Sequence, residues 1–153
     1  MQRDAIQKLI EWKDSLGRKP LIIKGARQTG KTWLMKEFGR LYYKETIYIN
    51  FENEPRFKSL FSNDFNISRI ISTLQLHYGK LIVPEDTLII FDEIQSVDGG
   101  VTSLKYFYED APQYSILAAG SLLGISIHEN QSFPVGKVSF IDLHPLSFGE
   151  FLK

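Results

Sequence analysis

The chain has 153 residues, of which 43% are hydrophobic and 13% aromatic, so it can bury one core but has no room for two domains. Its 18 basic and 18 acidic residues balance, so the overall charge gives no indication of binding to nucleic acid or an anionic membrane. The composition contains no cysteine, which excludes disulfides, cysteine nucleophiles and thiolate zinc sites; we expect a cytoplasmic protein without a signal peptide or membrane span.

Short apolar runs alternate with amphipathic stretches along the chain, which predicts an α/β fold with helices packed on a parallel sheet. In chain order, the expected elements are a helix at 4–16, a strand at 21–24, a helix at 31–42, a strand at 46–51, a helix at 67–78, a strand at 87–91, a short helix around 104–108, and strands at 114–119 and 138–143. The first helix carries Leu9, Trp12 and Leu16 on one face, and we expect this face to pack on the domain.

A glycine-rich segment joins the first expected strand to the next helix. Its residues are Gly25, Ala26, Arg27, Gln28, Thr29, Gly30, Lys31 and Thr32. They match the P-loop (Walker A) pattern G-x-x-x-x-G-K-[ST] in the strand-to-helix context that the motif requires. Backbone N–H groups of such a loop, and the positive end of the helix dipole, bind phosphates. We therefore expect the loop to bind ATP, with Lys31 contacting the β- and γ-phosphates and Thr32 binding Mg²⁺.

Two carboxylates, Asp92 and Glu93, follow the third expected strand. They lie at its carboxyl end, where ligands bind in open α/β sheets, and they resemble a Walker B pair. We expect Asp92 to hold Mg²⁺, through water, and Glu93 to orient and deprotonate the water that attacks the γ-phosphate. The loop and the pair together predict Mg²⁺-dependent ATP hydrolysis.

Two other uses of a P-loop are less favoured. A small-molecule kinase also needs the loop and an acid, but its nucleophile is a substrate hydroxyl, so the paired carboxylates favour attack by water. GTP is less favoured than ATP because the sequence has no Asn-Lys-x-Asp stretch, although nothing in it identifies adenine. The three histidines do not have the spacing of metal ligands.

Ser121 follows the fourth expected strand and is a further candidate. If that strand lies between the first and third, Ser121 falls between the loop and the carboxylates, where it would contact the γ-phosphate or the attacking water. The alternative is that Gly120 and Ser121 only form a tight turn after the strand.

These segments together resemble a prokaryotic AAA+-type ATPase, of the group usually followed by a second, uncharacterised C-terminal domain. The resemblance covers nearly the whole chain and rests on residues 25–32, 88–95, 118–124 and 145–152. It implies a P-loop NTPase fold in which helices sandwich a parallel five-stranded sheet of order 5-1-4-3-2. It also implies a sensor role in catalysis for Ser121 and a missing C-terminal half.

The expected domain organisation follows from this resemblance and from the last residues. Residues 1–143 are expected to form the P-loop ATPase domain, including the N-terminal helix at 4–16. Ser147 and Glu150 have the spacing of a capping box, which predicts that a helix begins within 144–153. A single turn with exposed aromatic side chains would be marginal in water, so we expect the natural protein to continue into a C-terminal region.

The arginines leave the mechanism open. Proteins of this type often carry Gly-Arg before the last strand, whereas this chain has Gly136-Lys137, and all its arginines precede Asp92. An arginine finger would have to come from Arg27, from a neighbouring subunit of a homo-oligomer, or from the absent region; Lys137 offers only a point charge.

The sequence therefore leaves two functions to be distinguished. The first is ATP hydrolysis coupled to the C-terminal domain. The second is a nucleotide-dependent switch or scaffold with negligible turnover. A DNA-acting motor is less favoured, because it would need a second such domain and the net charge gives no support.

Overall fold

The computed structural model describes residues 3–25, 30–121 and 136–143. Its elements are α1 (Arg3–Asp14), β1 (Leu21–Gly25), α2 (Lys31–Tyr42), β2 (Glu45–Asn50), the 3-10 turn η1 (Pro55–Phe57), α3 (Ile67–Tyr78), β3 (Thr87–Asp92), the 3-10 turn η2 (Ile94–Ser96), α4 (Gly100–Asp110), β4 (Ser115–Ser121) and β5 (Ser139–Asp142). Helices and strands alternate as predicted, and the α/β class is confirmed. The helix predicted within 144–153 lies outside the described residues.

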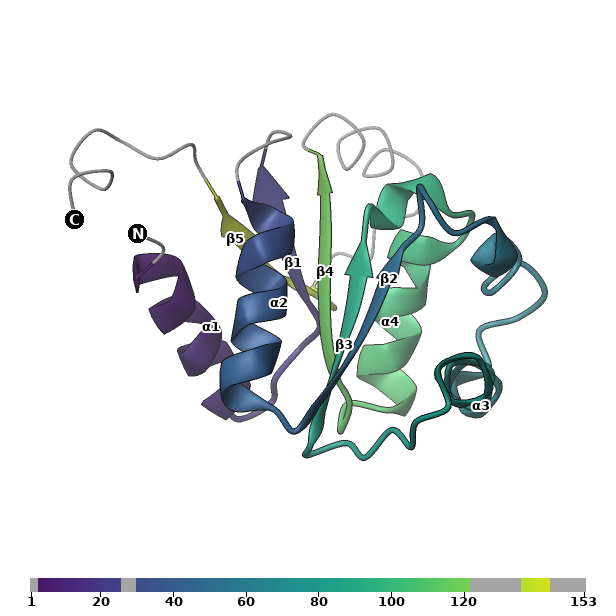
Figure 1. Cartoon of the computed structure of the whole chain (residues 1–153), viewed down its shortest axis with the longest axis horizontal. Coiled ribbons are helices and arrows are strands. Elements are labelled where there is room, and N and C mark those ends of the chain that lie inside the picture. Colours follow the sequence, from purple (N-terminus) through teal and green to yellow (C-terminus); the bar gives the residue numbers. More distant parts are fainter. Residues whose placement is uncertain (1–2, 26–29, 122–135, 144–153) are drawn as a thin grey trace.

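The strands form one parallel sheet in the order β2-β3-β4-β1-β5 (Figure 1). This is the predicted order 5-1-4-3-2, read from the opposite edge. β4 lies between β1 and β3, with Gly25 beside Ser121 and Phe91 beside Ala118. Because all neighbouring strands are parallel, the carboxyl ends of β1, β3 and β4 meet at one edge of the sheet.

Helices cover both faces of the sheet, so its central strands are apolar on both sides (Figure 1). On one face, α1 and α2 pack through Leu9, Trp12 and Phe38 against strand residues such as Leu88 and Ile90. On the other face, α3, α4 and the segment between β2 and α3 pack against the alternate strand residues. The alternation along β3 explains why its apolar run is continuous rather than amphipathic.

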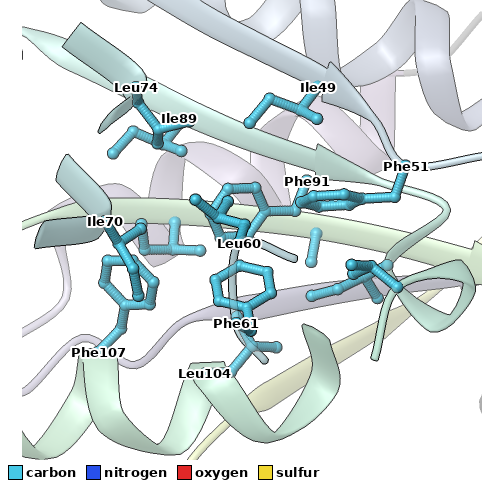
Figure 2. Packing of buried hydrophobic residues seen from close by; sticks show 14 of the residues in the cluster. Ile49, Phe51, Leu60, Phe61, Ile70, Leu74, Ile89, Phe91, Leu104 and Phe107 are labelled. Atoms are coloured by element: carbon cyan, nitrogen blue, oxygen red, sulfur yellow. The ribbon is translucent and has the colours of Figure 1, made fainter. Parts of the chain in front are cut away.

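The apolar cluster on the α3 and α4 face of the sheet fixes the end of β3. The ring of Phe91, the residue before Asp92, lies 5.5 Å from the ring of Phe51, 5.7 Å from that of Phe61 and 5.9 Å from that of Phe107, measured between centroids. Figure 2 shows these rings packed together between β3 and α4. Aromatic contacts of this kind add stability beyond the area they bury, so the strand end is held firmly where the carboxylates begin.

The prediction for the end of the first helix is wrong. α1 ends at Asp14 instead of residue 16, and Leu16 is fully exposed rather than part of the packing face. Ser15 ends the helix by donating both its backbone N–H and its hydroxyl to the carbonyl of Trp12. Gly17 then adopts a positive φ of 67°, which turns the chain toward β1 and carries Leu16 away from the sheet.

Among the described residues, no helix has the length and apolar character needed to span a membrane.

Gly100, at the start of α4, allows a close approach between this helix and the turn after β3. A Cβ atom at this position would lie 2.4 Å from the carbonyl oxygen of Ile94 and 2.6 Å from Cγ1 of Val97. A backbone atom cannot move aside as a flexible side chain can, so any larger residue must displace the helix or the turn. The packing of α4 therefore also sets the path of the chain just after the carboxylates.

We predict that Gly100→Ala lowers the free energy of unfolding by roughly 1–3 kcal/mol, the cost typical of overpacking. Gly39→Ala is the comparison, because the three atoms nearest to a Cβ there all belong to side chains, the closest being Oγ1 of Thr46 at 2.4 Å. Urea denaturation should show a smaller loss for Gly39→Ala than for Gly100→Ala. Wild-type stability in Gly100→Ala would contradict the close packing described.

Candidate functional site

Lys31 links the two ends of the glycine-rich segment by a hydrogen bond. Gly30 precedes α2 with a φ of 86°, a left-handed conformation that glycine adopts without strain. Lys31 begins the helix and is 7% exposed, and its Nζ donates a hydrogen bond to the carbonyl of Gly25 at 2.9 Å. The two ends of the loop are thereby linked. The remaining predicted loop residues, Ala26, Arg27, Gln28 and Thr29, lie outside the described residues.

Asp92 joins this loop to β3. This residue is 3% exposed, and its Oδ2 atom accepts hydrogen bonds from the hydroxyl of Thr32 at 2.6 Å and from the hydroxyl of Tyr48 at 2.5 Å. Oδ1 accepts the backbone N–H of Glu93 at 3.0 Å. Burying a carboxylate costs free energy unless its oxygens accept hydrogen bonds. Three donors, from α2, from β2 and from the residue after β3, provide these hydrogen bonds.

Tyr48 is a member of the site that the sequence analysis missed. Burial raises the pKa of its hydroxyl, and the hydrogen bond to Asp92 and the negative charge there raise that pKa further. The hydroxyl therefore stays protonated at neutral pH and acts as the donor in this contact. The available signal was the spacing of Tyr48 and Asn50, two residues apart near the end of β2, which places both side chains on one face of the strand.

Glu93 has an unusual backbone conformation. It is half-buried, with φ 52° and ψ 48°, and is the one non-glycine residue with positive φ in the described ranges. Its side chain is near Gln95, whose Nε2 lies 3.4 Å from Oε2. The left-handed region costs an L-residue roughly 1–2 kcal/mol, and such strain concentrates at functional sites. Here it turns the chain from β3 into η2.

A cavity of about 370 Å³ brings the predicted residues together. It is lined by Gly30, Lys31, Thr32, Trp33, Asn50, Glu52, Asp92 and Glu93. Its volume lies within the range of small-molecule sites. Five of the predicted residues therefore share one cavity with three that were not predicted: Trp33, Asn50 and Glu52. Asn50 is placed by the register of the sheet, in which it pairs with Asp92.

Two further candidates are placed differently. The backbone of Ser121 pairs with Gly25, which sets it beside the first residue of the loop, but its side chain is not among those described. Lys137 precedes β5, whose residue Ser139 pairs with Leu21 at the far edge of the sheet. Its Nζ lies 3.3 Å from Oε2 of Glu109, so Lys137 is not a cation of this cavity.

The side-chain oxygens of Thr32 and Asp92 in this cavity are of the kind that bind Mg²⁺. Within the described residues, no group of three or more His, Cys, Asp and Glu side chains is arranged to hold a metal. Mg²⁺ does not need such a cage, because it binds through one or two protein oxygens together with phosphates and waters. The hydroxyl of Thr32 and the carboxylate of Asp92, in contact at 2.6 Å, are donors of that kind.

Comparisons with known proteins agree with this architecture. The profile of the AAA domain family matches residues 17–152. The chain is similar to DnaA from Aquifex aeolicus bound to AMPPCP, with a TM-score of 0.58 and 17% identity, over 99% of this chain and 48% of that one. It is also similar to the Orc1 protein of Aeropyrum pernix in complex with DNA, with a TM-score of 0.54 and 16% identity, over 95% of this chain and 44% of that one.

The chain thus spans about half the length of the structures it matches. A comparison with curated proteins found no significant match. At these identities the likeness concerns the fold alone, and together with the strand order it confirms the predicted P-loop NTPase architecture.

We predict that Glu93→Gly is more stable than Glu93→Ala by roughly 0.5–1 kcal/mol, because glycine relieves the left-handed strain but loses more entropy on folding. Both variants lack the carboxylate, so the comparison isolates the backbone. Urea denaturation measures the difference. A Glu93→Ala protein at least as stable as Glu93→Gly would show that the backbone here is not strained.

Proposed function

Because the chain belongs to the AAA domain family, whose members are nucleotide-binding domains of the ATPase type, we propose that it binds ATP with Mg²⁺ and hydrolyses it. The reaction is assigned to the cavity between the start of α2 and the end of β3. One observation carries the proposal: Thr32 and Asp92 are hydrogen-bonded at 2.6 Å, and Glu93 lines the same cavity. The resemblance noted in the sequence is confirmed for the ATPase portion, while the C-terminal domain stays a prediction.

Each residue of the site has a proposed part. The loop from Gly25 to Thr32 cradles the phosphates with its backbone N–H groups, and Lys31 contacts the β- and γ-phosphates. Thr32 and Asp92 hold Mg²⁺, which when bound neutralises phosphate charge. Glu93 orients the attacking water and accepts its proton.

Three further parts of the proposal concern the surroundings of this site. Ser121 acts as a sensor beside the loop. Coupling to a C-terminal region, assembly into a homo-oligomer and a cytoplasmic location complete the proposal. Nucleic-acid binding is not included, because the net charge is zero.

The alternative function is a nucleotide-dependent switch with negligible turnover. It is supported by the cavity's lining, which contains no arginine from the described residues. Efficient phosphoryl transfer in related reactions uses such an arginine to stabilise charge in the transition state. Glu93 supports hydrolysis, because a switch that only binds nucleotide does not need a general base to activate water. Phosphate release by the wild-type protein separates the two functions.

We predict that Lys31→Ala weakens ATP binding at least tenfold, because this side chain supplies the cation for the β- and γ-phosphates. Lys44→Ala is the matched control: it removes an exposed lysine whose Nζ lies 3.7 Å from Asp86, away from the cavity. Isothermal titration calorimetry measures both. Equal ATP affinity in Lys31→Ala and in the wild type would show that this loop is not the nucleotide site.

We predict that Glu93→Gln separates binding from turnover. Mg·ATP affinity should stay within about tenfold of the wild type, since the metal is assigned to other residues, whereas phosphate release should fall by about 100-fold or more. Steady-state phosphate release and calorimetry measure the two effects. Unchanged phosphate release would refute the role of Glu93, and a wild-type protein that binds ATP but releases no phosphate would favour the switch.

A further inference from the structure

Two side chains from two elements converge on one carboxylate oxygen. Oδ2 of Asp92 accepts from Thr32 at the start of α2 and from Tyr48 in β2. Thr32 belongs to the phosphate loop, but Tyr48 does not line the cavity and has no part in the roles proposed above. We propose that Tyr48 is a positioning residue, which holds the carboxylate of Asp92 in the orientation that Mg²⁺-dependent nucleotide binding requires. This inference rests on the proposed function.

The hydrogen bonds around Asp92 show what Tyr48 contributes. Each oxygen of an ionised carboxylate offers about two acceptor positions. The hydroxyls of Thr32 and Tyr48 occupy both positions on Oδ2, and the N–H of Glu93 occupies one on Oδ1. Counting the contacts made by described residues, one acceptor position is left, and it lies on Oδ1. Without the hydroxyl of Tyr48, the carboxylate gains a second free position and loses one of the three contacts that fix its rotation.

Tyr48 is itself held from several sides, so it can orient a neighbour. The Nζ atom of Lys36 lies 4.2 Å from the centroid of the Tyr48 ring, and Lys36 follows Thr32 by one helical turn on the same face of α2. The backbone of Tyr48 is fixed by its pairing with Ile90 in β3. Residues that orient a metal ligand in this way often change metal affinity by 10–100-fold when they are replaced.

The test compares Tyr48→Phe with Tyr78→Phe. Both substitutions remove one hydroxyl from a half-buried tyrosine, but only Tyr48 contacts Asp92, whereas Tyr78 contacts the backbone of Tyr48. Calorimetry with a non-hydrolysable ATP analogue, in excess Mg²⁺ and again in EDTA, gives the gain in affinity that the metal provides. A role limited to packing would change both affinities alike.

We expect Tyr48→Phe to bind the analogue in EDTA as the wild type does, within about twofold, and to lose about tenfold of the gain from Mg²⁺. Tyr78→Phe should match the wild type in both conditions. A full wild-type gain in Tyr48→Phe would overturn the inference. A wild-type protein that gains nothing from Mg²⁺ would instead refute the proposed metal dependence, so the two failures are distinguishable.

A second comparison covers the case in which Tyr48→Phe disturbs the fold. If Tyr48 acts through Asp92, the substitution should cost no further Mg²⁺-dependent affinity in an Asp92→Asn background. An equal loss with and without the Asp92 carboxylate would overturn the inference, because the effect would then arise elsewhere.

Discussion

The hydrogen bond between Thr32 and Asp92 is the interaction on which the site depends. It joins residues 60 positions apart in the sequence and links the first turn of α2 to the carboxyl end of β3. β4 lies between β1 and β3, so the phosphate loop and the carboxylates are not on adjacent strands. The contact therefore depends on β1, β4 and β3 assembling in this order, which ties the site to the fold.

Rigid packing around the carboxylates supports this contact. Phe91 is held by aromatic rings on one side of the sheet, and Asp92 then faces the other side, toward α2. Immediately afterwards, Glu93 is held in a left-handed conformation, and η2 lies so close to Gly100 that a side chain there would overlap its backbone. A stable core and a strained turn meet at this point, as is common where a fold presents reactive groups.

The sequence was sufficient for the features that repeat or that follow a motif. Apolar runs such as 88–91 predicted the strands, and the Gly-Lys-Thr segment and the Asp-Glu pair predicted five residues of the cavity. Tyr48 was missed because its contact with Asp92 depends on the register between β2 and β3, which the predicted strand order alone does not give. The positive φ of Glu93 could not be predicted from the sequence, because glutamate rarely adopts that conformation. Leu16 was misplaced because helical periodicity continued beyond the residue where the helix ends.

The most direct test of the account is a double-mutant cycle between Thr32 and Asp92, measured as Mg²⁺-dependent affinity for a non-hydrolysable ATP analogue. Thr32→Val keeps the shape of the side chain without its hydroxyl, and Asp92→Asn removes the charge. If both residues hold one ion, the two losses should be strongly non-additive, with a coupling energy of about 1–3 kcal/mol. Losses that add within about 0.3–0.5 kcal/mol would contradict the account, because the two residues would then act independently.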